Sequence, residues 1–305
     1  MLLDDLNVIL KVAELKSITA AAESLDMQTA TASAAVKRVE KSLGIELFTR
    51  TTRQLRLSPA GEKYLPHCQQ AMQTLEFAKQ NVKHDLDIID GELRLAVSSD
   101  LGRNIVLPWL DEFLERHDKV SLKLHVSDSN IDFYRDSVDL ALRYGTLSDA
   151  NLYGFKICDI PRVLCATPEY LKENGNPKNL DELQRHNGLF YQLHDVLHDV
   201  WVFDGEGQET KVKMSGNRAG NDGDLVRRWC VQGKGIAAKS LLDMADDLLE
   251  QRVQVVLPEV QLKTTELWLV CPSRQSLTPA VRLLREFITQ KCEAKFQQLS
   301  DAGVI

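Results

Sequence analysis

The sequence lacks the long apolar runs and the cysteine pairs that mark membrane proteins and disulfide-stapled proteins. No run of about 18 apolar residues occurs among the 305 residues, so no transmembrane helix is predicted. The six cysteines are scattered singly, with no CxxC pair, a pattern typical of free thiols in a reducing compartment. No targeting segment is evident. We therefore expect a cytoplasmic protein with no membrane partner.

Signatures of catalysis and of metal binding are equally scarce. The sequence contains no GxSxG nucleophile turn, no glycine-rich phosphate loop and no HExxH motif. His194 and His198 have the i, i+4 spacing of helical metal ligands, but Asp195 and Asp199 favour a polar loop, and no convincing third ligand accompanies them. We expect no enzymatic activity, no cofactor and no metal site.

The composition of the chain is typical of globular proteins, and its charge is unevenly distributed along the sequence. With 44% hydrophobic and 27% charged residues, 305 residues suffice for two or three domains. The net charge of -7 conceals a basic segment, because residues 28–63 hold seven basic and three acidic side chains. Residues 91–305 contain 26 basic and 32 acidic residues. Such a segment on an acidic protein indicates contact with nucleic acid.

Three helices are predicted before and within the basic segment. Apolar residues at helical spacing predict the first, Thr19 is expected to cap the second, and the third covers residues 28–43 and ends at Gly44. The inward positions are expected to be Leu6, Ile9, Leu10 and Ala13 of the first helix and Ala32, Val36, Val39 and Leu43 of the third.

The second and third helices, joined by a short turn, form the pattern of a helix-turn-helix. The outer face of the third is polar and basic: Thr31 and Ser33 are short enough to let bases approach, while Lys37 and Lys41 suit phosphates. An ordinary three-helix bundle with a solvated basic face remains the alternative.

A short hairpin over residues 48–57 favours the DNA-binding interpretation. Leu55 and Leu57 are expected to face inward, and Arg50, Arg53 and Arg56 to face outward around the tip. An arginine on such a wing can enter a narrow minor groove and respond to its negative potential. Arg53, at the tip, is the residue predicted to do so.

A long helix is predicted from the Ser58-Pro59 cap to about Asp87. Its apolar residues follow a heptad pattern, with Lys79 in the one polar position. We expect this seam to pair with the same helix of a second copy, although packing against its own domain is an open alternative. The seam consists of Leu65, Cys68, Met72, Leu75, Val82, Leu86 and Ile89.

From Glu92 onward strands alternate with helices, which predicts a parallel α/β sheet. The economical arrangement is two α/β lobes with a cleft between them. In the first lobe the strands are expected at 93–98, 120–126 and 140–144 and the helices at 102–116 and 132–137. A similar unit is expected between residues 162 and 256, followed by a strand at 267–271 and a terminal helix from Pro279.

Four sequence landmarks occur in the first 90 residues: Ser17-Ile18-Thr19-x-Ala21-Ala22, Val36-x-x-Val39-Glu40-x-x-Leu43-Gly44, Leu47-Phe48-x-Arg50 and Leu57-Ser58-x-Ala60-Gly61. With these landmarks the chain resembles LysR-type transcriptional regulators over its whole length, most of all the subgroup with an Arg-Thr-Thr-Arg wing and an Asp-Leu-Ala-Leu-Arg-Tyr-Gly segment. Gln28, Thr29 and Ala30 depart from the Ser, Gln and Pro that are frequent in the family at these positions, so base preference is not carried over.

The resemblance implies an α/β protein with an N-terminal all-α winged helix-turn-helix at 1–58, a dimerising linker helix at 59–89 and a periplasmic-binding-protein-like effector domain at 90–305. Lobe I is expected at about 91–160 and 266–305, and lobe II at about 161–265. Implied partners are a double-stranded DNA operator, a small-molecule effector and further copies of the chain in a homodimer and homotetramer, with RNA polymerase as another candidate. The implied DNA-facing residues are Gln28, Thr29, Ala30, Thr31, Ser33, Ala34, Lys37 and Arg53.

An effector site is expected where strands of the sheet end, because ligands gather there in α/β folds. Ser98 and Ser99 follow the first strand, where unpaired backbone donors and the two hydroxyls can hold a carboxylate. Asp100 beside them would repel a carboxylate and favours a polar or cationic group nearby. Arg143 and Tyr144 end the third strand and are expected to face the cleft, although a structural ion pair is the alternative for Arg143. Across the cleft the predicted positions are Tyr191, Asn217, Asp222 and Gly235.

Oxidation of a thiol is a second sensing hypothesis. Cys230 is the candidate because Arg227, Arg228 and Lys234 lie near it in the sequence, and a basic setting favours a reactive thiolate. Structural burial of the thiol is the alternative.

Overall fold

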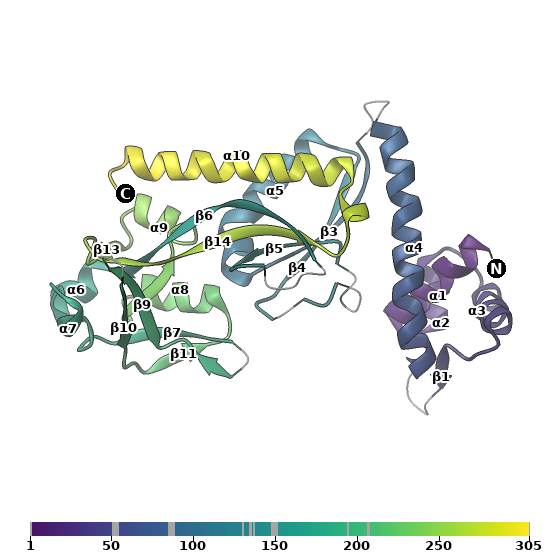
Figure 1. Ribbon diagram of the computed structural model, residues 1–305, viewed down its shortest axis with the longest axis horizontal. Coiled ribbons are helices and arrows are strands. Elements are labelled where there is room, and N and C mark those ends of the chain that lie inside the picture. The colour runs from purple at the N-terminus through teal and green to yellow at the C-terminus, as the bar shows by residue number, and fades with distance from the viewer. Residues whose placement is uncertain are drawn as a thin grey trace. The chain divides into compact units, whose positions relative to one another are not determined.

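The structure, a computed structural model, describes residues 2–50, 55–84, 89–129, 131–133, 136, 138–147, 152–193, 195–205 and 208–304. The chain divides into an N-terminal unit that ends at Ile88 and a C-terminal unit that begins at Ile89 (Figure 1). The N-terminal unit consists of α1 (Leu3–Leu15), α2 (Ile18–Ser24), α3 (Thr29–Leu43), β1 (Phe48–Arg50), β2 (Leu55–Leu57) and α4 (Pro59–His84).

Local signals explain where the helices of this unit begin and end. Ser17, and not Thr19 as predicted, caps α2: its hydroxyl accepts a hydrogen bond from the backbone N–H of Ala20 at 3.2 Å. The predicted end of α3 is right, because Gly44 adopts the left-handed conformation with φ of 69°.

The core of the N-terminal unit uses a wider face of α1 than the sequence predicted. Val8 and Val12 are fully buried beside Ile9, whereas Leu10 and Ala13 are only partly buried at the edge of the core. The reason is that α1 packs against α2, α3 and α4 at once, so that its buried stripe broadens.

The long helix α4 begins as predicted and then departs from the expected dimer seam. The Ser58 hydroxyl accepts from the N–H of Gly61 at 2.9 Å, which caps the helix ahead of Pro59. Leu65 and Cys68 are buried in the unit's own core. The first part of the heptad seam therefore serves intramolecular packing, and the prediction that all of it pairs with a second copy was wrong.

The C-terminal unit is built on a twelve-stranded sheet in which the main path runs β11-β7-β12-β6-β14-β5-β3-β4. One half comprises β3 (Gly91–Val97), α5 (Leu107–Arg116), β4 (Val120–Val126), β5 (Leu140–Tyr144) and α10 (Pro279–Asp301). The other half comprises α6 (Pro168–Asn174), α7 (Leu180–Leu183), β7 (Gly188–Leu193), β8 (Val196–Leu197), β9 (Val200–Gly205), β10 (Gln208–Lys213), β11 (Arg218–Gly220), α8 (Gly223–Val231), β12 (Ile236–Ser240), α9 (Ala245–Leu249) and β13 (Gln254–Val256). The strands β6 (Tyr153–Ala166) and β14 (Gln261–Cys271) belong to both halves.

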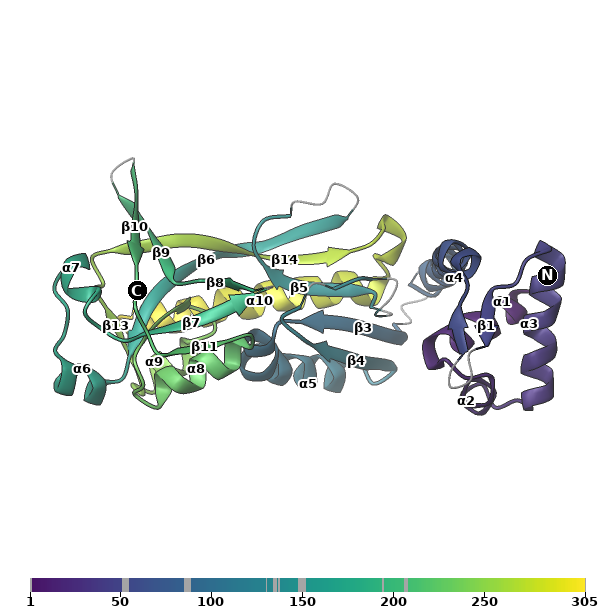
Figure 2. The same ribbon diagram turned by 90° about the horizontal axis from the view of Figure 1, so that it is seen from below.

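Strand directions match the predicted parallel sheet within each half but not between the halves. The groups β4-β3-β5 and β11-β7-β12 are parallel. The long strands β6 and β14 pair antiparallel with each other and with both groups, and they connect the two lobes (Figure 2). An all-parallel sheet was therefore wrong, because two long crossing strands join the halves.

Two predicted helices of the first lobe also differ. The expected helix at 102–116 starts as a π-helical turn over Leu101–Val106 and becomes α-helical at α5. Pro108 lacks the N–H that an α-helical bond to residue 104 requires, which accounts for the change. The predicted helix at 132–137 was wrong for its described residues, since 132, 133 and 136 are not helical.

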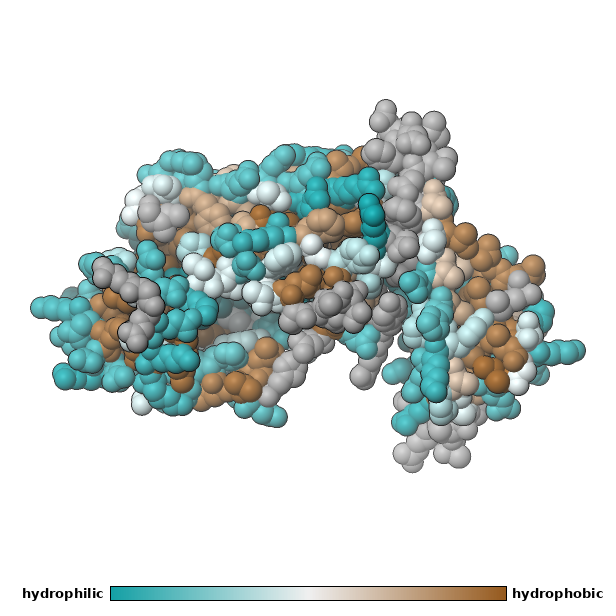
Figure 3. All heavy atoms as spheres, viewed as in Figure 1, coloured by the Kyte–Doolittle hydropathy of each residue, from teal (hydrophilic) through white to brown (hydrophobic). Residues whose placement is uncertain are grey.

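The terminal helix α10 begins at the predicted Pro279 and covers the sheet. Leu284, Phe287 and Ile288 are buried in a core shared with α5 and with β3, β5 and β14. Hydrophilic side chains cover much of its outer surface in the view of Figure 3.

In the part of the chain that the structure describes, no helix combines the length and apolarity needed to cross a membrane.

Candidate functional site

The outer face of α3 carries the residues that sequence analysis assigned to DNA. Ala32, Ala35 and Val36 point into the core, so the positions between them must face outward. Exposed positions are Gln28, Thr29, Ala30, Thr31, Ala34 and Lys37, and Ser33 is half-buried. Arg53, the predicted wing residue, lies outside the described residues.

One basic residue of α3 has a structural role. Arg38 donates two hydrogen bonds to the Asp5 carboxylate on α1, at 2.5 and 3.2 Å. Asp5 is only 3% exposed, and the hydrogen bonds from Arg38 lower the pKa of its carboxyl despite burial. This ion pair orients α3 on α1, so Arg38 is not simply part of a solvated basic face.

Glu40 is a further positioning residue that sequence analysis did not single out. Its Oε1 accepts from the backbone N–H groups of Leu47 and Phe48, at 2.8 and 3.2 Å. The carboxylate thereby ties the start of the β1–β2 hairpin to the end of α3. Its place in the Val39-Glu40 landmark was the one signal available in the sequence.

The C-terminal unit contains a cavity of about 390 Å³ between its two lobes. This is within the usual range for small-molecule sites. Of the predicted effector residues, five line the cavity, namely Ser98, Asp100, Arg143, Tyr144 and Tyr191. Ser99, Asn217, Asp222 and Gly235 are not among its lining residues.

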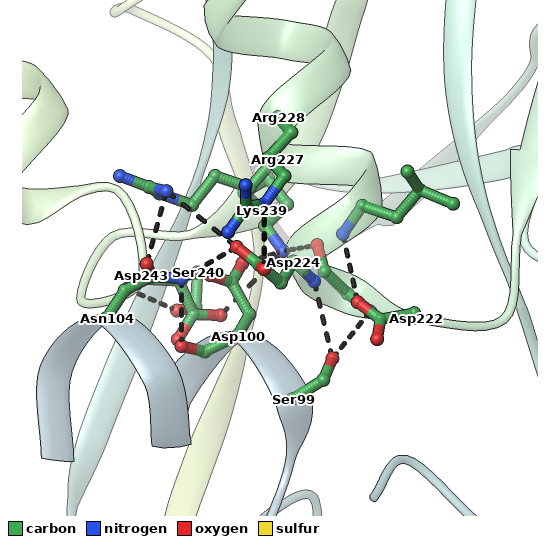
Figure 4. A network of polar contacts seen from close by, with 12 residues as sticks. Ser99, Asp100, Asn104, Asp222, Asp224, Arg227, Arg228, Lys239, Ser240 and Asp243 are labelled. Carbon is green, nitrogen blue, oxygen red and sulfur yellow. Dashed lines mark hydrogen bonds and ion pairs between the residues drawn. The ribbon is translucent and has the colours of Figure 1, made fainter. Parts of the chain in front are cut away.

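A buried charged cluster forms one wall of the cavity (Figure 4). Lys239 of β12 forms an ion pair with Asp100, lies 4.0 Å from Asp243 and donates to the carbonyl of Gly223 at 3.0 Å. Lys239 thus places a cationic group beside Asp100 within the protein itself. Burial raises the pKa of Asp100 to about 7 although Lys239 opposes the shift. Burial alone would lower the pKa of Lys239, but Asp100 and Asp243 outweigh it and raise that pKa.

Tyr144 belongs to the same wall and has its hydroxyl occupied. The O–H donates to Asp243 Oδ1 at 2.6 Å and lies 3.0 Å from the Ser240 hydroxyl. Burial, followed by the negative charge of Asp243, raises the pKa of Tyr144 well above its usual value. The tyrosine therefore stays neutral and joins β5 of one lobe to β12 of the other.

Polar contacts around the start of α8 also connect the two lobes. The Ser99 hydroxyl accepts from the N–H of Gly223 at 2.9 Å, and Asn104 donates to Asp224 at 2.9 Å (Figure 4). Arg103 donates to Asp222 at 2.9 Å. These contacts explain why Ser99 and Asp222 lie outside the cavity lining: both are used in joining the lobes.

Asn217 and Gly235 have a structural explanation as well. Both lie against Asn187, whose Nδ2 donates to Asn217 Oδ1 at 3.1 Å. A Cβ at Gly235 would be 2.3 Å from the carbonyl oxygen of Asn187, so no side chain fits there. The second lobe instead lines the cavity with residues that were not predicted from the sequence, among them Arg162, Leu189, His198, Trp201 and Lys239.

The Cys230 thiol is fully buried, which disfavours the oxidant-sensing hypothesis. Its Sγ donates to the carbonyl of Cys165 at 3.2 Å, and burial raises its pKa to about 12. The neighbouring arginines are engaged elsewhere, Arg227 with Asp247 and Arg228 with Asp224. A neutral buried thiol is a poor target for oxidants.

We also searched the described residues for a cluster of side chains that could bind a metal ion. No group of three or more His, Cys, Asp or Glu side chains suited to a metal occurs there. His198 lines the cavity, while His194 lies outside the described residues.

Comparison with known proteins assigns both units. Residues 3–62 match the model for the bacterial regulatory helix-turn-helix protein, lysR family, and residues 88–293 match the LysR substrate binding domain. The HTH-type transcriptional regulator DmlR of Escherichia coli K12 is 30% identical over 95% of this chain and 94% of its own length. The activator TtdR of the same strain is 28% identical over the same shares. CrgA of Neisseria meningitidis, a LysR-type regulator of known structure, is 29% identical with a TM-score of 0.60, over 96% of this chain and 98% of that one.

Proposed function

The chain belongs to the LysR family of DNA-binding transcriptional regulators with a substrate-binding effector domain, and from that premise we propose that α3 enters the major groove of its operator. The observation that carries this proposal is the outer face of α3, where short side chains and Lys37 project from a helix held rigidly by buried alanine and valine residues. Short side chains let a helix approach base edges, and lysine neutralises phosphates. Arg53 of the wing is proposed to contact the minor groove.

Salt-titrated gel shifts on fragments from upstream of the chain's own gene test this proposal. Lys37→Ala should weaken binding to every fragment and reduce the salt slope by about one, because one phosphate contact is lost. Thr31→Ala should change the preference at one base position. Lys172→Ala, which replaces an exposed residue of α6 in the C-terminal unit, is the control and should match wild type. The proposal fails if no fragment is preferred at any salt concentration and both α3 variants behave like wild type.

The cavity between the lobes is the proposed effector site. Residues from both lobes line it, and β6 and β14 cross between the lobes, so a ligand that contacts both walls can favour one lobe arrangement. We propose that this arrangement alters operator binding, and that the protein acts as a regulator and not as an enzyme. The boundaries proposed are 1–58 for the DNA-binding domain, 59–89 for the linker helix and 90–305 for the effector domain.

A homodimer through α4 and a homotetramer through the effector domains are the proposed assemblies. A two-fold protein implies a partly symmetric operator with one recognition helix in each half-site. RNA polymerase is the further proposed partner, and the cytoplasm the proposed compartment.

A further inference from the structure

We propose that the small molecule held in the interlobe cavity is an organic anion whose carboxylate binds the guanidinium of Arg162, an inference that rests on the proposed effector function of this cavity. The charged groups of the cavity lining differ in whether the protein already supplies their partners. Three carboxylates and three permanently basic side chains line the cavity: Asp100, Asp128, Asp243, Arg143, Arg162 and Lys239.

All three carboxylates already have hydrogen-bond donors or an ion-pair partner within the protein. Asp128 accepts hydrogen bonds at 2.6 Å from the N–H and the hydroxyl of Ser99 and from the N–H of Gly223, the first residue of α8. Asp100 pairs with Lys239, and Asp243 accepts from Tyr144. Their hydrogen-bonding capacity is thus directed at protein donors, and a cationic ligand would have to compete with those donors.

The two arginines have no such partners. Among the described residues, no carboxylate lies within ion-pair distance of the Arg162 guanidinium, and the one hydrogen bond of that guanidinium is a long contact of 3.4 Å to the carbonyl of Ala238. The guanidinium of Arg143, an exposed residue of the cavity lining, has neither a hydrogen bond nor an ion pair within the same set of residues. A guanidinium carries five N–H donors in a planar fork that matches a carboxylate, so most of Arg162's donors remain available to a ligand.

The surroundings of Arg162 suit an anion with an organic body. His198 is close enough that, after burial, the charge of Arg162 further lowers the pKa of the imidazole. The ring of His198 lies 5.8 Å from that of Tyr191. Leu189, Leu193 and Trp201 line the same lobe's side of the cavity. A hydrophobic surface beside a free guanidinium favours a carboxylate attached to a carbon skeleton over a free inorganic ion.

The test uses the full-length protein and a library of small organic acids, each paired with its primary amide and its amine of the same skeleton, plus inorganic phosphate. Thermal shift identifies binders and isothermal titration calorimetry measures their affinity. We expect a carboxylate to bind, its amide to bind at least about tenfold more weakly, and Arg162→Gln to lose about tenfold to a hundredfold in affinity, as expected for charge-assisted hydrogen bonds. Arg185→Gln, which removes an exposed arginine of the same lobe away from the cavity lining, should bind like wild type.

Several results would overturn the inference: no carboxylate binds, the best binders are neutral or cationic, phosphate alone binds, or carboxylate affinity is unchanged in Arg162→Gln. Operator gel shifts without ligand keep this failure distinct from failure of the proposed function. If wild type and Arg162→Gln both select the operator while carboxylates fail, only the ligand class is wrong. If no DNA fragment is selected, the regulatory proposal fails whatever binds in the cavity.

Discussion

Asp5 is a carboxylate buried on the apolar face of α1, where an unpaired charge would be costly. Arg38 compensates by donating two hydrogen bonds from α3, and the pKa of Asp5 is lowered as a result. A side chain that counts as basic surface in the sequence therefore contributes to the stability of the DNA-binding unit. Its contribution depends on pH, because Asp5 must be ionised to accept both bonds.

Replacing Asp5 by Asn should lower the unfolding midpoint of the N-terminal unit at neutral pH. Since the folded pKa lies below the ordinary value of 3.8, the stabilisation is fully present above that value and is lost as the pH falls through the folded pKa. Wild type and Asp5→Asn should therefore begin to converge as the pH falls below about 4, and should differ least below the folded pKa of Asp5. Circular dichroism melts across pH measure this, with the exposed neighbour substitution Asp4→Asn as control. A constant gap between the two proteins down to pH 2 would contradict the role of the charge.

Among the elements, the hairpin depends on α3 for its placement. It is only two three-residue strands, too short to be stable alone, and Glu40 holds its first strand through two backbone N–H groups. The neighbouring Gly61 of α4 permits the same close packing, because a Cβ there would lie 2.2 Å from the carbonyl oxygen of Leu47. These two contacts hold the start of the hairpin close to α3 and α4.

Glu40→Ala should destabilise the N-terminal unit by about 1–3 kcal/mol, because two backbone donors lose their acceptor. It should also weaken operator binding although Glu40 is not a proposed DNA contact. Removing a negative charge near DNA would by itself strengthen binding, so Glu46→Ala, an exposed substitution of equal charge change, is the matched control. Thermal melts and gel shifts of both variants measure the effects; equal behaviour of the two would exclude a positioning role for Glu40.

At the scale of the whole molecule, the part of the α4 seam that follows Cys68 is proposed to join two copies. Leu65 and Cys68 are buried in the core of the N-terminal unit, whereas Leu75 on the same helix is 48% exposed. A large apolar side chain at a heptad position on a solvent-facing helix suits a partner helix. The expected dimer thus depends on the second part of the seam.

Leu75→Glu should weaken dimerisation at least about tenfold, because a charge would be buried without a partner at the centre of a helix pair. Sedimentation velocity over a concentration series measures the change, and operator affinity should fall with it. Gln70→Glu adds the same charge on a different face of α4 and serves as control. If Leu75→Glu sediments as wild type does, α4 is not the dimer contact.

The local features of this protein could be predicted from its sequence. The Gly44 end of α3, the Ser58-Pro59 start of α4, the 120–126 and 140–144 strands and the outward face of α3 all follow from signals within a few residues. The reason is physical: capping, backbone conformation and hydrophobic periodicity act between near neighbours. Five of the residues that line the cavity could be predicted the same way, because they follow strand ends or occupy expected sheet positions.

The tertiary structure decided what depends on residues far apart in the chain. The width of the buried face of α1, the division of the α4 seam and the antiparallel crossing of β6 and β14 depend on which elements pack together. The use of Ser99 and Asp222 in joining the lobes, and the pairing of Asp100 with Lys239, join segments more than a hundred residues apart. Arg162 shows the limit most clearly, because a free guanidinium is recognised only once every carboxylate around it has been assigned a partner.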